Sequence, residues 1–115
     1  MFRLRIQTMS DDRIDDARLQ SWLAEHPHWT PVMVAGVPAL QRSITLNNFS
    51  AALHLANSIA VHAEQQNHHP QLTLSWGKLE VLWWSHDVQG ISARDLRLAA
   101  QTDREVAETQ RRSPV

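Results

Sequence analysis

The change of hydrophobic period at Pro70 constrains the fold of this 115-residue chain more than any other feature. Before it, apolar residues between Phe49 and Ala63 recur every three or four positions, which predicts an amphipathic helix. After it, residues 72–83 alternate with a period of two, which predicts strands. Because proline disfavours helical backbone at the preceding residue, the helix must end at or before His69. The chain therefore combines a long helix with a sheet.

The alternating residues after Pro70 predict a β-hairpin. Gly77-Lys78 lies between the two apolar runs and has the form of a two-residue loop with glycine first. This loop would place Trp76 opposite Leu79, with the larger apolar side chains of both strands on one face.

The rest of the chain predicts a second hairpin and two more helices. Residues 29–46 change toward a period of two, interrupted at 35–38. Arg42 falls on their otherwise apolar face, which is tolerable near a sheet edge where the charged head reaches water. A helix is expected over residues 11–25, and another after Ser92-Ala93-Arg94-Asp95, which has the form of a capping box.

This order of elements, helix, two strands, helix, two strands, helix, predicts an α+β fold. We expect a two-layer sandwich in which a four-stranded antiparallel sheet carries the helices on one face. The length suits a single domain over residues 1–115, with 1–9 and 109–115 as loose ends. Leu82 and Trp84 fall on the face without helices and need a cover from a ligand or another subunit. Oligomerisation would meet that need and would also protect the open sheet edges.

Composition excludes several classes of function. The net charge is −1, and one lysine and ten arginines are scattered rather than clustered, so no basic stripe for nucleic acid is visible. The absence of cysteine excludes disulfides and thiolate chemistry. No apolar run approaches membrane-spanning length, and residues 1–6 lack the apolar core of a signal peptide, so a soluble cytoplasmic protein is expected.

Two adjacent histidines, His68 and His69, stand where the helix pattern stops. The unperturbed pKa of histidine is the nearest to neutral among side chains, so such a pair could give and take protons. Glu64 precedes His68 by one helical turn and could accept a hydrogen bond from its ring. The alternative is structural, since histidines also suit the negative end of a helix dipole.

A third histidine, His86, follows the second strand of the hairpin. The antiparallel return brings Leu72 beside Trp83, so His86 should lie close to Pro70 and the three imidazoles converge. Three neutral histidines could bind zinc, but Glu64 is the one carboxylate nearby to orient such ligands. A metal-free acid/base site is favoured, in which one imidazole protonates a leaving hydroxyl and another removes a proton from a neighbouring nitrogen or carbon.

These residues resemble the motif of the pterin-4a-carbinolamine dehydratases. That motif has an acidic residue, three variable positions, His-His-Pro, an aromatic residue, a further histidine and an aspartate. The matching positions here are Glu64, His68-His69-Pro70, Trp76, His86 and Asp95. Residues 76–86 look like the bacterial branch in particular, and the resemblance covers roughly residues 20–108.

The resemblance implies a lyase that removes water from 4a-hydroxytetrahydropterin to give quinonoid dihydropterin, without a metal or cofactor of its own. Such enzymes serve aromatic amino-acid hydroxylases and form homodimers or homotetramers. His68 and His86 would be the acid/base pair, and His69 would bind and orient the pterin. The implied substrate-binding residues are Glu64, Asn67, Pro70, Trp84, Ser85, Asp87 and Val88, with Trp76 and Asp95 as structural motif positions.

A non-catalytic binding module is the alternative. Asn67 stands where the family often has aspartate, and Leu72 stands where it often has an aromatic residue. The family also contains dimerisation cofactors of transcription factors and assembly factors for other proteins. The apolar Leu82 and Trp84 would then belong to a partner-binding surface.

Overall fold

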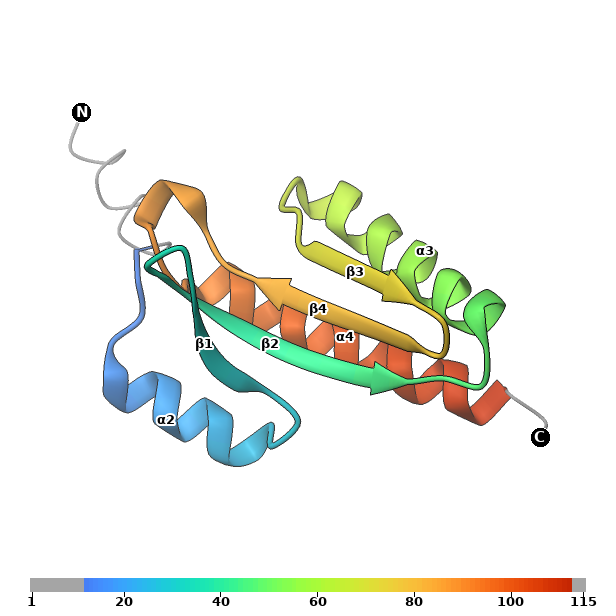
Figure 1. The fold of residues 1–115 in the computed structure, drawn as a ribbon. Helices are drawn as coiled ribbons and strands as arrows, with labels where there is room; N and C mark the ends of the chain where they lie inside the picture. Colours follow the sequence, from blue (N-terminus) through green and yellow to red (C-terminus); the bar gives the residue numbers. More distant parts are fainter. Residues whose placement is uncertain (1–11, 113–115) are drawn as a thin grey trace.

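The computed structural model describes residues 12–112 (Figure 1). Its elements, in chain order, are α2 (Asp16–Glu25), β1 (Thr30–Val34), β2 (Val37–Thr45), α3 (Phe49–Gln66), β3 (Gln71–Ser75), β4 (Lys78–Trp83), the short 3₁₀ turn η1 (His86–Val88) and α4 (Ala93–Arg112). None of the helices in this part of the chain is long and apolar enough to cross a membrane.

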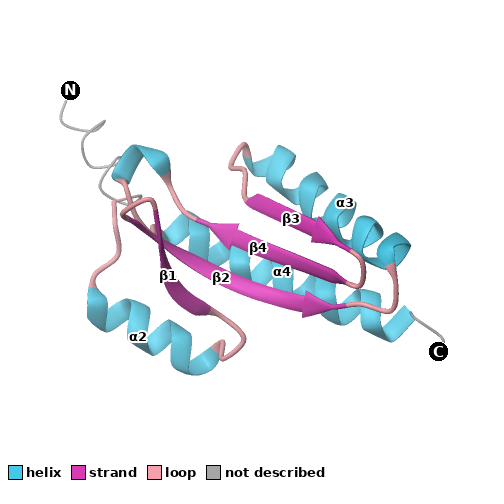
Figure 2. Cartoon of the chain, in the orientation of Figure 1, coloured by secondary structure: helices cyan, strands magenta, loops and turns pink. Residues whose placement is uncertain are grey.

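The four strands form one antiparallel sheet in the order β1-β2-β4-β3. Helices α3 and α4 lie along one face of the sheet, and α2 lies beside α4 at the β1 side (Figure 2). The predicted α+β sandwich with a four-stranded antiparallel sheet is therefore confirmed.

The core lies between the sheet and helices α3 and α4. Register puts the large apolar side chains of neighbouring strands on the same face, so that Leu40 opposes Trp83 and Ile44 opposes Leu79. Fully burying a Leu, Ile or Val side chain contributes about 1.5–3 kcal/mol to folding. The buried residues that fill this layer are Leu40, Ile44, Leu55, Ile59, Leu79, Val81, Trp83, Leu96, Leu98, Ala99 and Val106.

The β1–β2 turn is shorter than predicted. It consists of Ala35-Gly36 alone, with φ of 50° and 83°, while Pro38 lies within β2 opposite Met33. Two positive φ values are typical of the type I′ turn, whose twist matches that of the strands. Pro38 is tolerated in the strand because β2 begins to pair with β4 only at Leu40.

The β3–β4 register differs from the prediction by two residues. Leu74, not Trp76, lies opposite Leu79, and the loop is Trp76-Gly77 with glycine second. Gly77 has a φ of +73°, and its carbonyl accepts a hydrogen bond of 2.8 Å from the Leu46 amide, which fixes the loop position. Because the shift is even, every strand residue keeps its predicted face. Trp76 itself projects from the loop and is 74% exposed.

Arg42 lies one residue past the β1–β2 pairing, which ends where Gln41 opposes Thr30, so within the sheet only β4 flanks it. Its side chain is only 10% exposed and forms an ion pair with Asp103 of α4. The prediction that the guanidinium group reaches water is therefore wrong. A carboxylate from the covering helix neutralises the guanidinium instead.

Two helix boundaries also differ from the prediction. Helix α2 begins at Asp16 rather than residue 11, because Asp15 caps it by accepting a hydrogen bond of 2.8 Å from the Arg18 amide. Residues 12–15 instead run beside the start of α4, where the Ile14 amide donates to the Ile91 carbonyl. Helix α4 includes residues 109–112, which were expected to be loose. The other predicted loose residues, 1–9 and 113–115, and the first predicted helical residue, 11, lie outside the described residues.

The expected exposure of Leu82 is also wrong. Leu82 is 7% exposed within the chain itself, at the centre of the sheet between Gln41 of β2 and Gln71 of β3. Trp84 is half-buried, at the end of β4. The face without helices otherwise carries exposed polar residues such as Ser43 and Thr73.

Candidate active site

A cavity of about 480 Å³ opens between the end of α3 and the end of β4. Two chain segments meet there, residues 67–71 after α3 and residues 84–87 after β4. Figure 1 shows both segments at the same end of the sheet. The residues that line the cavity are Asn67, His68, His69, Pro70, Gln71, Trp84, His86 and Asp87. The three histidines that the sequence singled out thus share one cavity.

Asn67 sets the direction of the two adjacent histidines. It ends α3 in the left-handed conformation, with a φ of 52°, and its amide donates to carbonyls of the last helical turn. The His68 amide then donates to the Ala63 carbonyl at 3.1 Å. The chain turns at Asn67, so His68 points into the protein and His69 stays at the surface.

His68 is the buried member of the pair, with a side chain 11% exposed. Its Nε2 lies 2.7 Å from Asp95 Oδ1 and donates to that carboxylate. The ring also stacks on Trp83, with centroids 5.9 Å apart and an interplanar angle of 11°. The predicted partner, Glu64, forms no hydrogen bond with this ring and pairs with His69 instead. The reversal at Asn67 removes His68 from the helix, so the one-turn spacing no longer brings the two side chains together.

Asp95 is fully buried and holds a network of donors. Its Oδ2 accepts hydrogen bonds from Ser85 Oγ at 2.7 Å and from the Ser92 amide at 2.9 Å. The two serine hydroxyls are 2.8 Å apart, and both serines are also fully buried. Buried carboxylates need such donors, because an unpaired charge in the interior is costly. The capping-box pattern predicted the Ser92–Asp95 contact, but the pattern gave no sign that Asp95 also reaches His68.

His69 and Glu64 form a pair at the rim of the cavity. His69 Nε2 lies 2.6 Å from Glu64 Oε2, and the two side chains are 55% and 76% exposed. An exposed pair of this kind contributes little to stability. It does fix the orientation of the His69 ring.

The opposite wall consists of Trp84, His86 and Asp87. His86 is exposed and meets Trp84 edge to face, with centroids 5.4 Å apart at an angle of 63°. Asp87 forms an ion pair of 2.6 Å with Arg94 of α4. The hydrogen bond from Arg94, followed by its positive charge, holds the pKa of Asp87 below its ordinary range. Asp87 therefore presents a carboxylate to the cavity at neutral pH.

The other predicted site residues lie outside the cavity lining. Ser85 is buried in the Asp95 network, while Glu64 and Val88 flank the site without lining it. Trp76 is at the opposite end of the β3–β4 hairpin. Gln71 lines the cavity and was missed, because a polar residue at a strand start carries no distinctive signal. Within residues 12–112, no group of three or more histidine, aspartate or glutamate side chains is placed to hold a metal ion.

The geometry supplies the parts of an acid/base site for a flat ligand. The Asp95 carboxylate accepts from His68 Nε2 and so fixes the tautomer of the ring, which leaves Nδ1 as the nitrogen that can accept a proton. Pro70 and Trp84 offer apolar surface between the histidines. Proton donors and acceptors thus stand on both sides of a cavity with apolar walls.

Sequence comparison identifies the class of protein to which this fold and site belong. The family model described as pterin 4 alpha carbinolamine dehydratase matches residues 12–105. The chain belongs to this family.

Curated relatives carry the same name provisionally. One from Hahella chejuensis is 35% identical over 80% of this chain and 82% of its own length. One from Saccharophagus degradans is 40% identical over 79% of both chains. Both are named pterin-4-alpha-carbinolamine dehydratases, with the activity left provisional in the name.

Solved structures share the fold at lower sequence identity. The transcriptional coactivator/pterin dehydratase from Brucella melitensis has a TM-score of 0.75 at 23% identity and covers 83% of this chain and 99% of its own. A pterin dehydratase-like protein described as a RuBisCO assembly factor in the alpha-carboxysome has a TM-score of 0.57 at 14% identity, over 68% of this chain and 88% of its own. At these identities the likeness concerns the fold.

Proposed function

We propose that this protein dehydrates 4a-hydroxytetrahydropterin to quinonoid dihydropterin. The observation that carries the proposal is the single cavity shared by His68, His69 and His86, with His68 held by a buried carboxylate. Membership of the dehydratase family and the names of the relatives support the choice of substrate.

In the proposed reaction one imidazole gives a proton to the C4a hydroxyl, which leaves as water. A second imidazole takes a proton from a ring nitrogen, so that a double bond forms as the C–O bond breaks. We assign these two roles jointly to His68 and His86, which come from different segments on either side of the cavity. His69 would orient the pterin, Pro70 and Trp84 would contact its ring, and Asn67 and Asp87 would bind its polar edge. Each proton transfer by a positioned side chain is worth about 10²–10⁴ in rate.

The test is the disappearance of 4a-hydroxytetrahydropterin with the wild type and with His68→Ala, His69→Ala and His86→Ala. His54→Ala is the matched control, because His54 is an exposed histidine of α3 that does not line this cavity. We expect losses of about 10²–10⁴ for His68→Ala and His86→Ala and none for the control. A wild type no faster than buffer would overturn the proposal.

Exposed apolar side chains on α3 favour a second candidate function, the binding of a partner protein. Phe49, Leu53 and Val61 are 45%, 43% and 55% exposed, and Leu82, which sequence analysis assigned to such a surface, is buried. The surface would instead be the outer side of α3, used either for homo-oligomers or for a different protein. One structural neighbour is described as an assembly factor.

The second candidate is tested with a variant that lacks all three cavity histidines. If the protein is a binding module, the variant should keep a stable hetero-complex isolated from its own cell extract, whereas Leu53→Asp should lose it. A partner that dissociates when the histidines are removed would contradict this role. Size-exclusion chromatography of the purified chain separates homo-oligomers from such a complex.

A further inference from the structure

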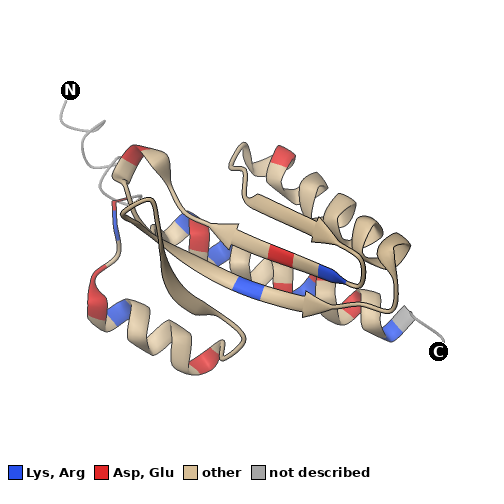
Figure 3. Cartoon of the chain, in the orientation of Figure 1, with Lys and Arg blue, Asp and Glu red and all other residues tan. Residues whose placement is uncertain are grey.

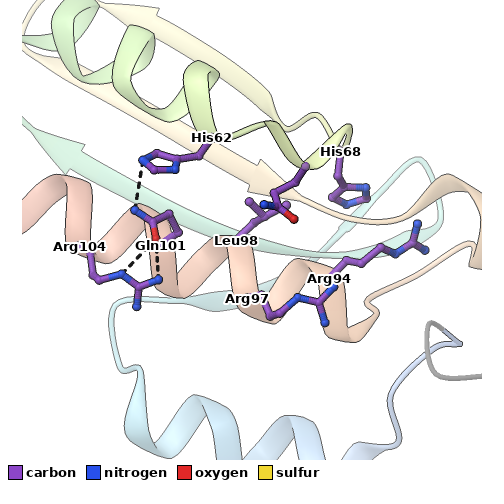
Figure 4. Close-up of a pocket in the computed structure, with 8 residues that line it drawn as sticks. His62, His68, Arg94, Arg97, Leu98, Gln101 and Arg104 are labelled. Carbon is purple, nitrogen blue, oxygen red and sulfur yellow. Dashed lines mark hydrogen bonds between the residues drawn. The ribbon is translucent and has the colours of Figure 1, made fainter. Parts of the chain in front are cut away.

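A second, smaller cavity of about 240 Å³ lies between α3 and α4 (Figure 4). Figure 4 shows His62 and His68 on one side of it and side chains of α4 on the other. Its lining residues are His62, Gln66, His68, Arg94, Arg97, Leu98, Gln101 and Arg104. No carboxylate is among them, so the lining is strongly basic.

The cationic side chains of this lining are three arginines of α4, a helix on which Figure 3 shows the Arg positions in blue. Arg94, Arg97, Gln101 and Arg104 follow one another at spacings of three, four and three residues, which places them along one side of a helix. Arg94 and Arg97 are three residues apart, a spacing at which like charges repel, while the neutral Gln101 separates this pair from Arg104. Arg94 also lies in the first turn of α4, where the helix dipole disfavours a cation. This arrangement carries a local electrostatic cost, and residues that break a local rule are often functional.

The neighbouring acidic groups neutralise only part of this charge. Arg94 is paired with Asp87, and Glu105 is engaged by His62 at 2.7 Å. Asp95 is engaged by His68. The Arg104 side chain donates to the neutral Gln101 side chain, and the Arg97 guanidinium has no hydrogen-bond or ion-pair partner among residues 12–112. Two guanidinium groups, those of Arg97 and Arg104, thus line the cavity without a carboxylate partner in the described chain.

We propose that this cavity binds a phosphate group. Guanidinium groups recognise phosphate oxygens through charge-assisted hydrogen bonds, and a doubly charged anion would balance the two uncompensated arginines. The side-chain amide of Gln66 adds a neutral donor, whereas that of Gln101 already donates to Glu105 Oε2 at 3.1 Å. The volume is below the roughly 300–1,000 Å³ typical of pockets for drug-sized ligands, so it suits a small anion or the phosphate end of a larger one.

The site is distinct from the proposed pterin site, yet the two adjoin. His68 lines both cavities, and the Arg94–Asp87 ion pair links a residue of one to a residue of the other. Phosphate binding does not depend on any dehydratase activity and can be measured without a pterin. Because His68 lines both cavities, an anion bound in the basic cavity would change the surroundings of the His68 ring.

The experiment is a titration of the full chain with inorganic phosphate at low ionic strength, followed by calorimetry and by the ring signals of the histidines. We expect saturable binding of one phosphate that shifts the signals of His62 and His68 but not that of His28, which lies outside this cavity. Arg97→Gln should weaken binding about tenfold or more, because a hydrogen bond to a charged group is lost. Arg111→Gln, the same substitution at an exposed residue of α4 paired with Glu108, is the matched control and should leave the affinity unchanged.

Two results would overturn the proposal: absence of saturable phosphate binding to the wild type, or equal weakening by Arg97→Gln and Arg111→Gln. Glycerol phosphate as a second titrant identifies the source of the anion. Displacement of inorganic phosphate by glycerol phosphate supports a site for the end of a larger molecule, and selective binding of the free ion supports an inorganic anion site. Arg104→Gln repeats the test at the second uncompensated arginine.

Discussion

His68 and His86 face the same cavity but are held in different ways. His68 is nearly buried, stacked on Trp83 and bonded to a carboxylate that is itself fixed by two buried serines. His86 lies on a short 3₁₀ turn, exposed to water, with an edge-on contact to Trp84. One wall of the site is therefore pre-organised by the core of the protein, and the other is adjustable. Such a site can fix one proton-transfer group in advance and let the other follow the ligand.

The largest effect is expected from removing the carboxylate of the pre-organised wall. Asp95→Ala deletes the acceptor for Ser85 Oγ, the Ser92 amide and His68 Nε2, all in the interior. Leaving these buried donors without an acceptor should lower the free energy of unfolding by about 3–5 kcal/mol, measured by urea titration. Asp87→Ala, at a carboxylate that is 61% exposed, should cost less than about 1 kcal/mol. Equal losses in the two variants would remove the distinction between the walls.

Substitution of the two histidines should likewise lower the free energy of unfolding more at His68 than at His86. His68→Ala removes a stacked, hydrogen-bonded ring and should destabilise the fold by about 2 kcal/mol. His86→Ala changes an exposed side chain, so the unfolding free energy should change by less than about 0.5 kcal/mol. Urea midpoints of the two variants make the check, and a His86→Ala variant that unfolds as easily as His68→Ala would show that both walls carry structure.

The smallest effect concerns the charge on the adjustable wall. Arg94→Gln removes the hydrogen bond and the positive charge beside Asp87, so the pKa of Asp87 should rise toward its ordinary range. Because the folded-state pKa is lowered, the pair stabilises the protein above the unfolded pKa of about 3.9, and this contribution is lost as the pH falls through the folded pKa. Exposure to solvent keeps the contribution small. An NMR titration of the Asp87 carboxyl carbon measures the shift, and an unchanged pKa would contradict the role of Arg94.

The same contrast explains what could be predicted from the sequence. The hydrophobic period and the positions of proline and glycine predicted the element order, the sheet and the converging segments. Each of these depends on local patterns, such as the apolar face of the helix before Pro70 and the alternation after it. Contacts between distant side chains could not be predicted. Helical spacing predicted a hydrogen bond between Glu64 and His68. Because Asn67 adopts the left-handed conformation, Glu64 instead bonds to His69, and His68 bonds to Asp95, 27 residues later.

The predicted exposures of Arg42 and Leu82 were wrong for a related reason. Alternation shows which face a residue occupies, but it does not show which strand is central or what lies above the face. Asp103 of α4 forms an ion pair with Arg42, and Leu82 stands on the central strand β4 between Gln41 of β2 and Gln71 of β3. The even shift of the second hairpin left the faces intact, which is why the histidines meet despite the incorrect register.

The most direct measurement is a titration of the protein with 7,8-dihydropterin, observed through the ring signals of its seven histidines. A pterin bound in the shared cavity should shift His68, His69 and His86 together, with His86 moving most, and leave His26, His28 and His54 unchanged. If the three cavity histidines stay unperturbed, or the shifts fall on the other histidines, the proposed pterin site is contradicted.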